Sequence, residues 1–318
     1  MKKITAIFIM LFMVVACTPR TEVVYDNVKD GVVFIQNKHN EQSGLGTGFF
    51  IEENLIITNY HVVAESKNIN IFIQDSNYEW KATVVSHSEQ HDIALVKIDD
   101  WDKFVSKEKW KVLEFTDSTQ AQVGETVYAL GHPWGLGWTF SQGILSKKDR
   151  PAPGTTSVLF LQVDARVYQG NSGGPLLDAY GRVLGINSQM LEGKGGSYGF
   201  VIPSQYVQKV VYDLKKYNES KVMKLGIMLG LTNDKEYVTI TEIMSDSAAE
   251  KCNLQKDDVV LEIKTLASGV YQKVRNTMDM VKQVLTLNMD QGLVSLIIKR
   301  SETRQEVDCE IGSNADKG

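Results

Sequence analysis

The sequence predicts a mostly β protein with two successive domains. Its 318 residues are enough for two domains, and an apolar content of 43% suits folded modules better than disorder. From Gly44 to Phe200, short apolar stretches are separated by Gly and Asn, which is typical of antiparallel barrels or sandwiches. From Leu225 to Ile311, the pattern changes to a mixture of strands and short helices. We therefore expect an all-β first domain and a small α+β second domain.

The first domain is expected to contain a series of short strands closed by one helix. The strands are GTGFFI, NLIITN, INIFIQ, EWKATVV, DIALVKI, ETVYALG, WTFSQGILS, VLFLQVD, GGPLL, RVLGINS and SYGFVI. The helix should run from about Ser204 to Tyr217, because its apolar residues recur near one face and Pro203 precedes it. The expected division is a leader over 1–16, a first domain over 17–217, a linker over 218–224 and a second domain over 225–318.

The second domain should begin and end with strands. The expected order is strands LGIMLGL and YVTITEI, a helix at SDSAAEKC, strand DVVLEI, a helix around VRNTMDMVKQVLTL, and strands LVSLIIK and RQEVDCEI. About 90 residues are enough for one small core.

The N-terminus, MKKITAIFIMLFMVVAC, indicates export. Two lysines precede an apolar run from Ala6 to Ala16, which is too short for a comfortable membrane span of ~20 residues. A short uncleaved anchor is the alternative. The end of the run resembles a bacterial lipobox, with Val14 where leucine is usual. This resemblance implies cleavage before Cys17, lipidation of its sulfur and a tether to the membrane.

Charge and cysteine content narrow the function further. The net charge of −5 and the pI near 5.6 give no basic patch that would favour nucleic acid. Apart from Cys17, only Cys252 and Cys309 remain, too few for a disulfide framework and unlike a zinc site in spacing. We expect buried free thiols, and a single bridge in an oxidising compartment is the alternative.

The stretch QGNSGGPLL places Ser172 in a glycine-rich turn before an apolar run. A serine hydroxyl is a weak nucleophile that needs a base, a group that orients the base, and donors for the oxyanion. His61 follows the strand LIITN, and Asp92 opens the strand DIALVKI. The order His, Asp, Ser is one of the known orders of a catalytic triad.

The glycines beside Ser172 suggest an oxyanion hole. Without a Cβ, Gly170 and Gly173 can take conformations that other residues cannot, so the N–H groups of Gly170 and Ser172 can point at one spot. Singly, each candidate has a simpler interpretation as a turn serine, a packed histidine or a strand-start aspartate. The segment His87–Asp92 has histidines at i and i+4, but that spacing joins side chains only on a helix, and its neighbours resemble strands. We therefore expect no metal there.

Taken together, the motifs are identified as those of a known family. GTGFFIEENLIITNYHVV, HDIALVKI, LQVDARVYQGNSGGPLLDAYGRVLGIN and YGFVIPS resemble, in order and spacing, the HtrA/Deg family of trypsin-like serine proteases. The resemblance runs from about Gly44 to Ser204. It implies a chymotrypsin-like double β-barrel, with His61 as general base, Asp92 as its orienting group and Ser172 as nucleophile. It also implies that no metal or organic cofactor is needed.

The same resemblance assigns residues around the site. Val167 and Met190 stand where the family lines its first specificity pocket, which implies a small aliphatic residue before the scissile bond. Arg166 replaces a usual alanine and would favour an acidic residue if it pointed into the pocket. We expect it to point outward and stay hydrated. The loop Gly143–Gly154 resembles the family's regulatory loop, with Arg150 at its basic position.

The C-terminal module resembles a PDZ domain from about Met223 to Ile311. The turn Leu225, Gly226, Ile227 and Met228 would offer N–H groups to the C-terminal carboxylate of a peptide that adds as a strand. A structural β domain without a ligand is the alternative. Asn253 and Asp257 stand where the family has glycines, and both residue types tolerate left-handed φ.

The expected function is an endopeptidase of the bacterial envelope, or periplasm, that degrades misfolded exported proteins. Its partners would be unfolded or extended polypeptides and, at the PDZ domain, C-terminal peptides. The resemblance implies a homotrimer formed through the segment Val23–Ile35. Two alternatives are a chaperone or binding protein with a resting inactive site, and a peptide-activated signalling protease with one membrane-protein target.

Overall fold

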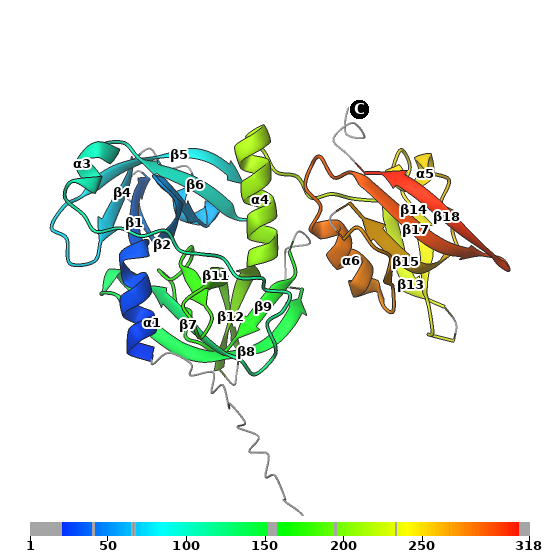
Figure 1. The fold of residues 1–318 in the computed structure, drawn as a ribbon, viewed down its shortest axis with the longest axis horizontal. Coiled ribbons are helices and arrows are strands. Elements are labelled where there is room, and N and C mark those ends of the chain that lie inside the picture. Colours follow the sequence, from blue (N-terminus) through cyan, green and yellow to red (C-terminus); the bar gives the residue numbers. More distant parts are fainter. Residues whose placement is uncertain are drawn as a thin grey trace, which may run out of the picture.

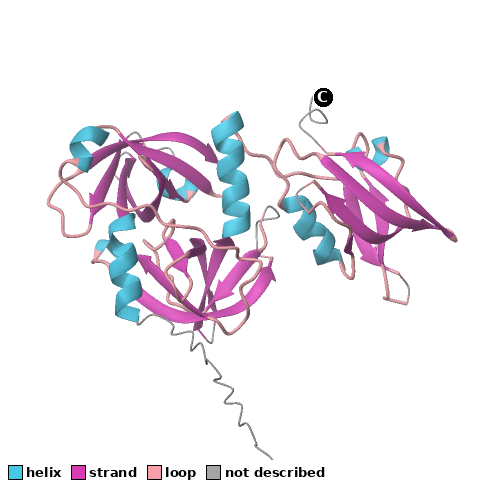
Figure 2. Ribbon diagram, in the orientation of Figure 1, coloured by secondary structure: helices cyan, strands magenta, loops and turns pink. Residues whose placement is uncertain are grey.

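A computed structural model describes residues 21–39, 42–64, 66, 68–151, 158–193, 196–232, 234–266 and 268–311. Its strands form two closed barrels and a separate C-terminal sheet (Figures 1 and 2). The fold is therefore mostly β, with a double barrel followed by a small α+β domain, as the sequence predicts. The expected leader and Cys17 lie outside the described residues.

The first barrel has the strand order β1-β2-β3-β6-β5-β4, and β1 closes it by pairing with β4. Side chains alternate between core and solvent along β5, as a half-buried strand requires. Its interior is filled by aliphatic and aromatic side chains that include Ile35, Phe50 and Ile71. The strands are β1 (Val32–His39), β2 (Gln42–Glu52), β3 (Leu55–Thr58), β4 (Asn68–Ile73), β5 (Trp80–Ser88) and β6 (Ile93–Ile98).

The second barrel has the order β10-β11-β12-β9-β8-β7 and a core of its own around Val127, Leu145 and Leu176. A further apolar cluster, which includes Phe49 and Ile186, packs between the two barrels. The strands are β7 (Thr126–Gly131), β8 (Thr139–Arg150), β9 (Phe160–Val163), β10 (Pro175–Leu177), β11 (Val183–Gly193) and β12 (Gly196–Pro203).

Helices pack against the outside of the barrels (Figure 1). The helix α4 (Ser204–Tyr217) has the predicted bounds and ends where Asn218 adopts a left-handed φ of 58°. The helix α1 (Thr21–Val28) is not predicted from the sequence, and its Val24 and Val28 are buried in the cluster between the barrels. The other short helices here are η1 (Lys29–Gly31), α2 (Tyr60–Val63), α3 (Trp101–Val105) and η2 (Pro133–Gly135). No helix in the described residues is both long and apolar enough to span a bilayer.

The C-terminal domain is one sheet of order β13-β14-β15-β17-β18, with β16 paired to β15. It buries its own core, which includes Ile240 and Ile263. Asn253 and Asp257 have left-handed φ values of 60° and 70°, as expected for residues that replace glycine. The elements are β13 (Ile227–Leu231), β14 (Val238–Ile243), α5 (Ala248–Lys251), β15 (Val259–Thr265), β16 (Gln272–Lys273), α6 (Thr277–Leu285), β17 (Leu293–Arg300) and β18 (Thr303–Glu310).

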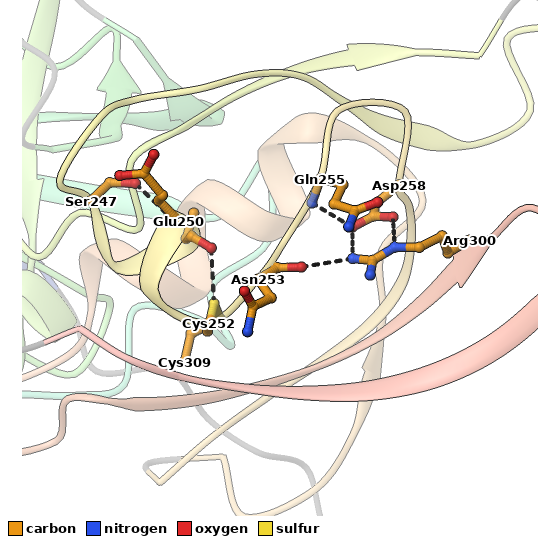
Figure 3. The surroundings of a disulfide bond; sticks show 9 residues. Ser247, Glu250, Cys252, Asn253, Gln255, Asp258, Arg300 and Cys309 are labelled. Atoms are coloured by element: carbon orange, nitrogen blue, oxygen red, sulfur yellow. Dashed lines mark hydrogen bonds and ion pairs between the residues drawn. A yellow bond between two sulfur atoms is a disulfide. The ribbon is translucent and has the colours of Figure 1, made fainter.

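The two late cysteines form a disulfide, so the expectation of free thiols is wrong (Figure 3). Cys252 ends α5, and Cys309 lies in the domain core on β18, which brings their Cα atoms to 5.2 Å across 57 residues of sequence. The two cysteines come close together because of how the sheet folds, so their spacing in the sequence does not predict the bridge. Nearby, the Arg300 guanidinium donates to both carboxylate oxygens of the buried Asp258, at 2.7 Å each.

A buried ion pair on α4 links the helix to the C-terminal domain. Lys209 Nζ lies 3.0 Å from Asp213 Oδ2, and both side chains are almost fully buried. Asp213 also accepts from Ser220 Oγ at 3.0 Å and from the Met289 N–H at 3.1 Å. Lys209 Nζ donates to the Lys221 carbonyl at 2.7 Å. These hydrogen bonds compensate the burial of both charges.

His91 is buried beside this pair and directly precedes Asp92. Its Nδ1 lies 2.8 Å from Ser88 Oγ, which donates to the Ser220 carbonyl at 3.2 Å. Burial, followed by the nearby positive charge of Lys209, lowers the pKa of His91 to about 3. His91 is therefore neutral in the folded protein at pH 7.

Acidification should destabilise the protein through His91. The pKa of a histidine is 6.5 in the unfolded chain and about 3 for His91 in the folded protein. Between pH 6.5 and pH 3 the unfolded chain therefore binds a proton that the folded protein does not, which favours unfolding. The contribution of His91 to the free energy of unfolding is complete above pH 6.5 and should fall by roughly 1.4 kcal/mol per pH unit below it. His91→Gln should flatten the slope of the free energy of unfolding against pH, measured by urea unfolding at several pH values. His87→Gln, at an exposed histidine, should keep the wild-type slope; identical slopes in all three proteins would contradict this account.

Reduction of the disulfide should selectively destabilise the C-terminal domain. A bridge across 57 residues restricts the unfolded chain, and its loss typically costs about 2–5 kcal/mol. Calorimetry with and without a thiol reductant should show a lower melting temperature for this domain only. The Cys252→Ala/Cys309→Ala variant should melt at the lowered temperature in both conditions. A fully reduced wild type with an unchanged melting temperature would refute the prediction.

Candidate active site

His61 and Asp92 meet at one end of the first barrel. His61 lies on α2, directly after β3, and Asp92 lies in the turn before β6. His61 Nδ1 is 2.9 Å from both carboxylate oxygens of Asp92, and the His61 backbone N–H donates to Oδ1 at 3.0 Å. Because one carboxylate binds both the ring and the backbone, it fixes the ring orientation. The other ring nitrogen, Nε2, is left for proton transfer.

Ser188 on β11 joins Asp92 to Ser172. Its hydroxyl donates to Asp92 Oδ2 at 2.9 Å, and its carbonyl accepts from Ser172 Oγ at 3.1 Å. The three sequence-predicted residues are therefore brought into one site. Among the described residues, no hydrogen bond joins Ser172 to His61. In serine hydrolases this hydrogen bond is often long in the free enzyme and shortens when substrate binds. Ser188 is not predicted from the sequence, where its one signal is that it is a polar residue after the apolar run Val183–Ile186.

Ser172 sits in a turn that only glycines can form. Gly170 and Gly173 have φ values of 101° and 84°. A Cβ on Gly170 would lie 2.5 Å from the His132 carbonyl oxygen, and one on Gly173 would lie 2.1 Å from the Thr47 carbonyl oxygen. In the described part of the chain, the N–H groups of Gly170 and Ser172 donate to no other backbone group. Both remain available to an oxyanion.

Thr47, on β2 of the first barrel, holds this turn of the second barrel. Its N–H donates to the Ser172 carbonyl at 2.9 Å, and its hydroxyl donates to the Gly170 carbonyl at 2.7 Å. The hydroxyl also accepts from the His132 N–H at 3.2 Å, and Thr58 Oγ1 donates to the Thr47 carbonyl at 2.7 Å. Thr47 is fully buried. Thr47 lies in the family motif GTGFFI, but its role cannot be predicted from that motif.

The expected specificity residues lie on adjoining elements. Val167 is buried, and a Cβ on Gly199 would meet its Cγ2 at 2.8 Å. Gly199 on β12 pairs with Met190 on β11, so Val167 packs beside this strand pair; the Met190 side chain lies outside the described residues. Arg166 is exposed, in line with the outward orientation we expect, and its carbonyl accepts from Ser141 Oγ at 3.0 Å.

The expected regulatory loop is described only in part. Arg150 is exposed at the end of β8, opposite Phe160 on β9, and residues 152–154 of the loop lie outside the described residues. The adjacent Asp149 forms an ion pair with Lys282 of α6, with Nζ 2.5 Å from Oδ2. The base of the loop therefore contacts the C-terminal domain.

The expected carboxylate-binding turn precedes the edge strand of the C-terminal sheet. The Leu225 carbonyl accepts from the Ala249 N–H of α5 at 2.9 Å, and Gly226 has a φ of 80°. A Cβ on Gly226 would lie 2.2 Å from Ser247 Cβ. Ile227 and Met228 open β13, whose one partner among the described strands is β14. An open edge of this kind can accept a peptide strand.

The histidines of the segment 87–92 do not converge. His87 is exposed and stacks on Tyr60 with ring centroids 4.8 Å apart, whereas His91 is buried against Ser88. No cluster of His, Cys, Asp or Glu that could hold a metal occurs among the described residues.

Comparisons with known proteins cover both domains. A trypsin-like peptidase domain matches residues 46–186, and a PDZ domain matches residues 213–299. A probable periplasmic serine endoprotease, DegP-like, from Pseudomonas putida (strain W619) is 32% identical over 88% of this chain and 58% of its own length. A protein of the same name from Rickettsia conorii is 34% identical over 73% of this chain and 47% of its own length. The chain thus spans about half the length of the curated relatives it matches.

Solved structures agree with this fold over nearly the whole chain. The HtrA-type protease AlgW with a tripeptide has a TM-score of 0.75 at 24% identity, over 92% of this chain and 97% of its own. The serine endoprotease from Yersinia pestis has a TM-score of 0.65 at 25% identity, over 92% of this chain and 98% of its own. Domain content, curated relatives and fold all agree with the motif-based expectation, and the chain belongs to the HtrA/Deg family of trypsin-like serine proteases.

Proposed function

We propose that this protein is a serine endopeptidase of the bacterial cell envelope that degrades misfolded or damaged exported proteins. The observation that carries the proposal is the continuous contact from His61 through Asp92 and Ser188 to Ser172. The names of the curated relatives, which describe periplasmic serine endoproteases, support the same activity and location.

The chemistry is acyl transfer in two steps. Ser172 Oγ attacks the substrate carbonyl while His61 Nε2 accepts its proton, and Asp92 stabilises the imidazolium that forms. The N–H groups of Gly170 and Ser172 hold the oxyanion, and one such donor is typically worth about 3–4 kcal/mol. His61 returns the proton to the leaving amine, and water then hydrolyses the acyl-enzyme. The reaction requires no metal or organic cofactor.

The open edge of β11 supports an extended substrate. Gly185 and Ile186 of β11 pair with both β10 and β12, whereas the stretch from Gln189 to Gly193 pairs only with β12 in the described chain. A polypeptide can therefore add beside this stretch as a strand, with Ser172 next to it. Only an unfolded or extended chain offers a free strand, which favours misfolded proteins as substrates. Val167 and Met190 would then hold a small aliphatic side chain before the scissile bond.

Other parts of the chain are assigned by the same proposal. The turn from Leu225 to Met228 would bind the C-terminal carboxylate of a peptide that adds to β13, and Arg150 would help order the active site. Lipidation at Cys17 after removal of residues 1–16 would tether the protein to the membrane, and the segment Val23–Ile35 would form a homotrimer. The protease domain would span residues 17–217 and the PDZ domain residues 225–318, joined by a linker over 218–224.

Replacing the nucleophile should abolish proteolysis. The chain without residues 1–17 should cleave reduced casein, and Ser172→Ala should lower the rate by about 10⁶-fold, to an undetectable level. Ser106→Ala, at an exposed serine after α3, should retain wild-type activity. The measurement is peptide release on a gel and by mass spectrometry.

Either of two results would weigh against this proposal. Equal cleavage by Ser172→Ala would exclude Ser172 as nucleophile. Absence of cleavage by a folded wild-type chain, even with C-terminal peptides added, would favour a binding role over proteolysis.

Loss of the Thr47 hydroxyl should lower catalysis without unfolding the protein. Thr47→Val keeps the shape but leaves the Gly170 carbonyl and the His132 N–H without their buried partner. We expect kcat to fall about tenfold, because misplacement of the nucleophile turn weakens oxyanion binding. Thr83→Val, at an exposed threonine on β5, is the matched control. An unchanged kcat with normal circular dichroism would show that the backbone alone positions the turn.

A further inference from the structure

Two aromatic side chains pack together beside the Ser172 turn, and an exposed leucine follows one of them by two residues. Trp134 is 50% exposed and Leu136 is 84% exposed, the highest fraction among the large hydrophobic residues of the described chain. Tyr168 is half-buried and packs on Trp134, with ring centroids 4.8 Å apart and planes inclined by 31°. We call Trp134, Leu136 and Tyr168 the aromatic rim.

The aromatic rim is in direct contact with the expected oxyanion hole. The Trp134 N–H donates to the Gln169 carbonyl at 2.9 Å. A Cβ on Gly170 would lie 2.8 Å from the Trp134 nitrogen and 2.9 Å from Pro133 Cα, so the backbone of the rim packs on Gly170 itself. Tyr168 precedes Gly170 by two residues in sequence. A substrate carbonyl held by Gly170 is therefore next to these side chains.

The backbone of the rim is held in conformations that cost free energy. Trp134 has a φ of 51°, which is unfavourable for a bulky residue, and Gly135 and Gly137 follow with φ values of 71° and 138°. Burial in the core does not explain this, because half of the Trp134 side chain and most of Leu136 face solvent. An exposed aromatic residue in a strained segment beside a reactive group indicates a contact with a ligand.

An apolar residue of the first barrel adjoins the rim. A Cβ on Gly135 would lie 3.2 Å from Leu45 Cδ1, so the partly buried Leu45 of β2 lies beside the rim segment. Leu45 precedes Thr47, which binds the Gly170 carbonyl, by two residues.

The direction of the substrate decides which part of it meets the rim. If the acyl part of the substrate pairs with β11 beyond Ser188, the chain after the scissile bond leaves past Gly170 and away from β11. That path runs over Trp134 and Tyr168. We propose that the aromatic rim is a binding site for a large apolar or aromatic substrate side chain just after the scissile bond.

This inference rests on the proposed endopeptidase function and narrows its substrate class. Aromatic side chains bind other aromatic rings in offset or edge-to-face arrangements, and the exposed face of Trp134 offers such a surface. Large apolar residues are mostly buried in folded proteins and accessible in unfolded ones. If the rim binds large apolar residues next to the cleaved bond, misfolded chains are cleaved in preference to folded ones, because it is mainly misfolded chains that expose such residues.

The test compares two peptides that differ only after the scissile bond. The peptides share one acyl part and carry either Phe or Ala in the first two positions of the leaving part. For the wild type, kcat/KM should be about tenfold or more higher for the Phe peptide, the range that one apolar pocket provides. Trp134→Ala should bring this ratio close to one, mainly by slowing the Phe peptide. Trp134→Phe should retain most of the preference, which excludes misfolding as the cause.

Tyr78→Ala is the matched control, because Tyr78 is also an exposed aromatic residue packed on a second ring, that of Trp80 in the first barrel. It should keep the wild-type ratio. If the wild type cleaves both peptides and Trp134→Ala leaves the ratio unchanged, the rim proposal is wrong while the endopeptidase proposal stands. If the wild type and Ser172→Ala are equally inactive on both peptides and on casein, the endopeptidase proposal itself fails.

Discussion

The candidate site depends on one buried threonine that joins the two barrels. Thr47 belongs to the first barrel, yet it binds the carbonyl groups of Gly170 and Ser172 in the second. Its own carbonyl is held by Thr58, at the end of the strand that leads to His61. Hydrogen bonds through Thr47 thus help to set the distance from His61 to Ser172, in addition to the contacts that run through Asp92 and Ser188. Such bonds are strong in a buried setting, where water cannot replace them.

Much of the fold follows from local sequence patterns, whereas the contacts that complete the site do not. Alternating apolar residues and glycine-rich turns predict the strands, and the spacing of His61, Asp92 and Ser172 within family motifs predicts their meeting. Ser188 and Thr47 were missed because their roles arise from partners distant in sequence. The Cys252–Cys309 bridge was mispredicted for the same reason. The short helix α1 owes its stability to burial against the barrels rather than to a pattern of its own.

The C-terminal domain is attached through polar groups close to the candidate site. Asp213 of α4 binds the Met289 N–H, and Asp149 at the base of the regulatory loop pairs with Lys282. The first contact lies beside His91, which directly precedes Asp92. Because Asp213 is fully buried, movement of this domain would remove the Met289 N–H from Asp213 Oδ1, while Lys209 of the same helix would remain paired with Oδ2. The position of this domain therefore depends on contacts near Asp92 and Arg150.

The division of the site between two barrels has a consequence during the proposed export to the envelope. Each barrel closes from a contiguous stretch of chain, β1 to β6 and then β7 to β12, and domains generally fold from the N-terminus as they emerge. The first barrel can therefore be complete, with His61 already oriented by Asp92, before Ser172 has crossed the membrane. A partly exported chain holds a base without a nucleophile, so the emerging polypeptide is not exposed to the assembled triad.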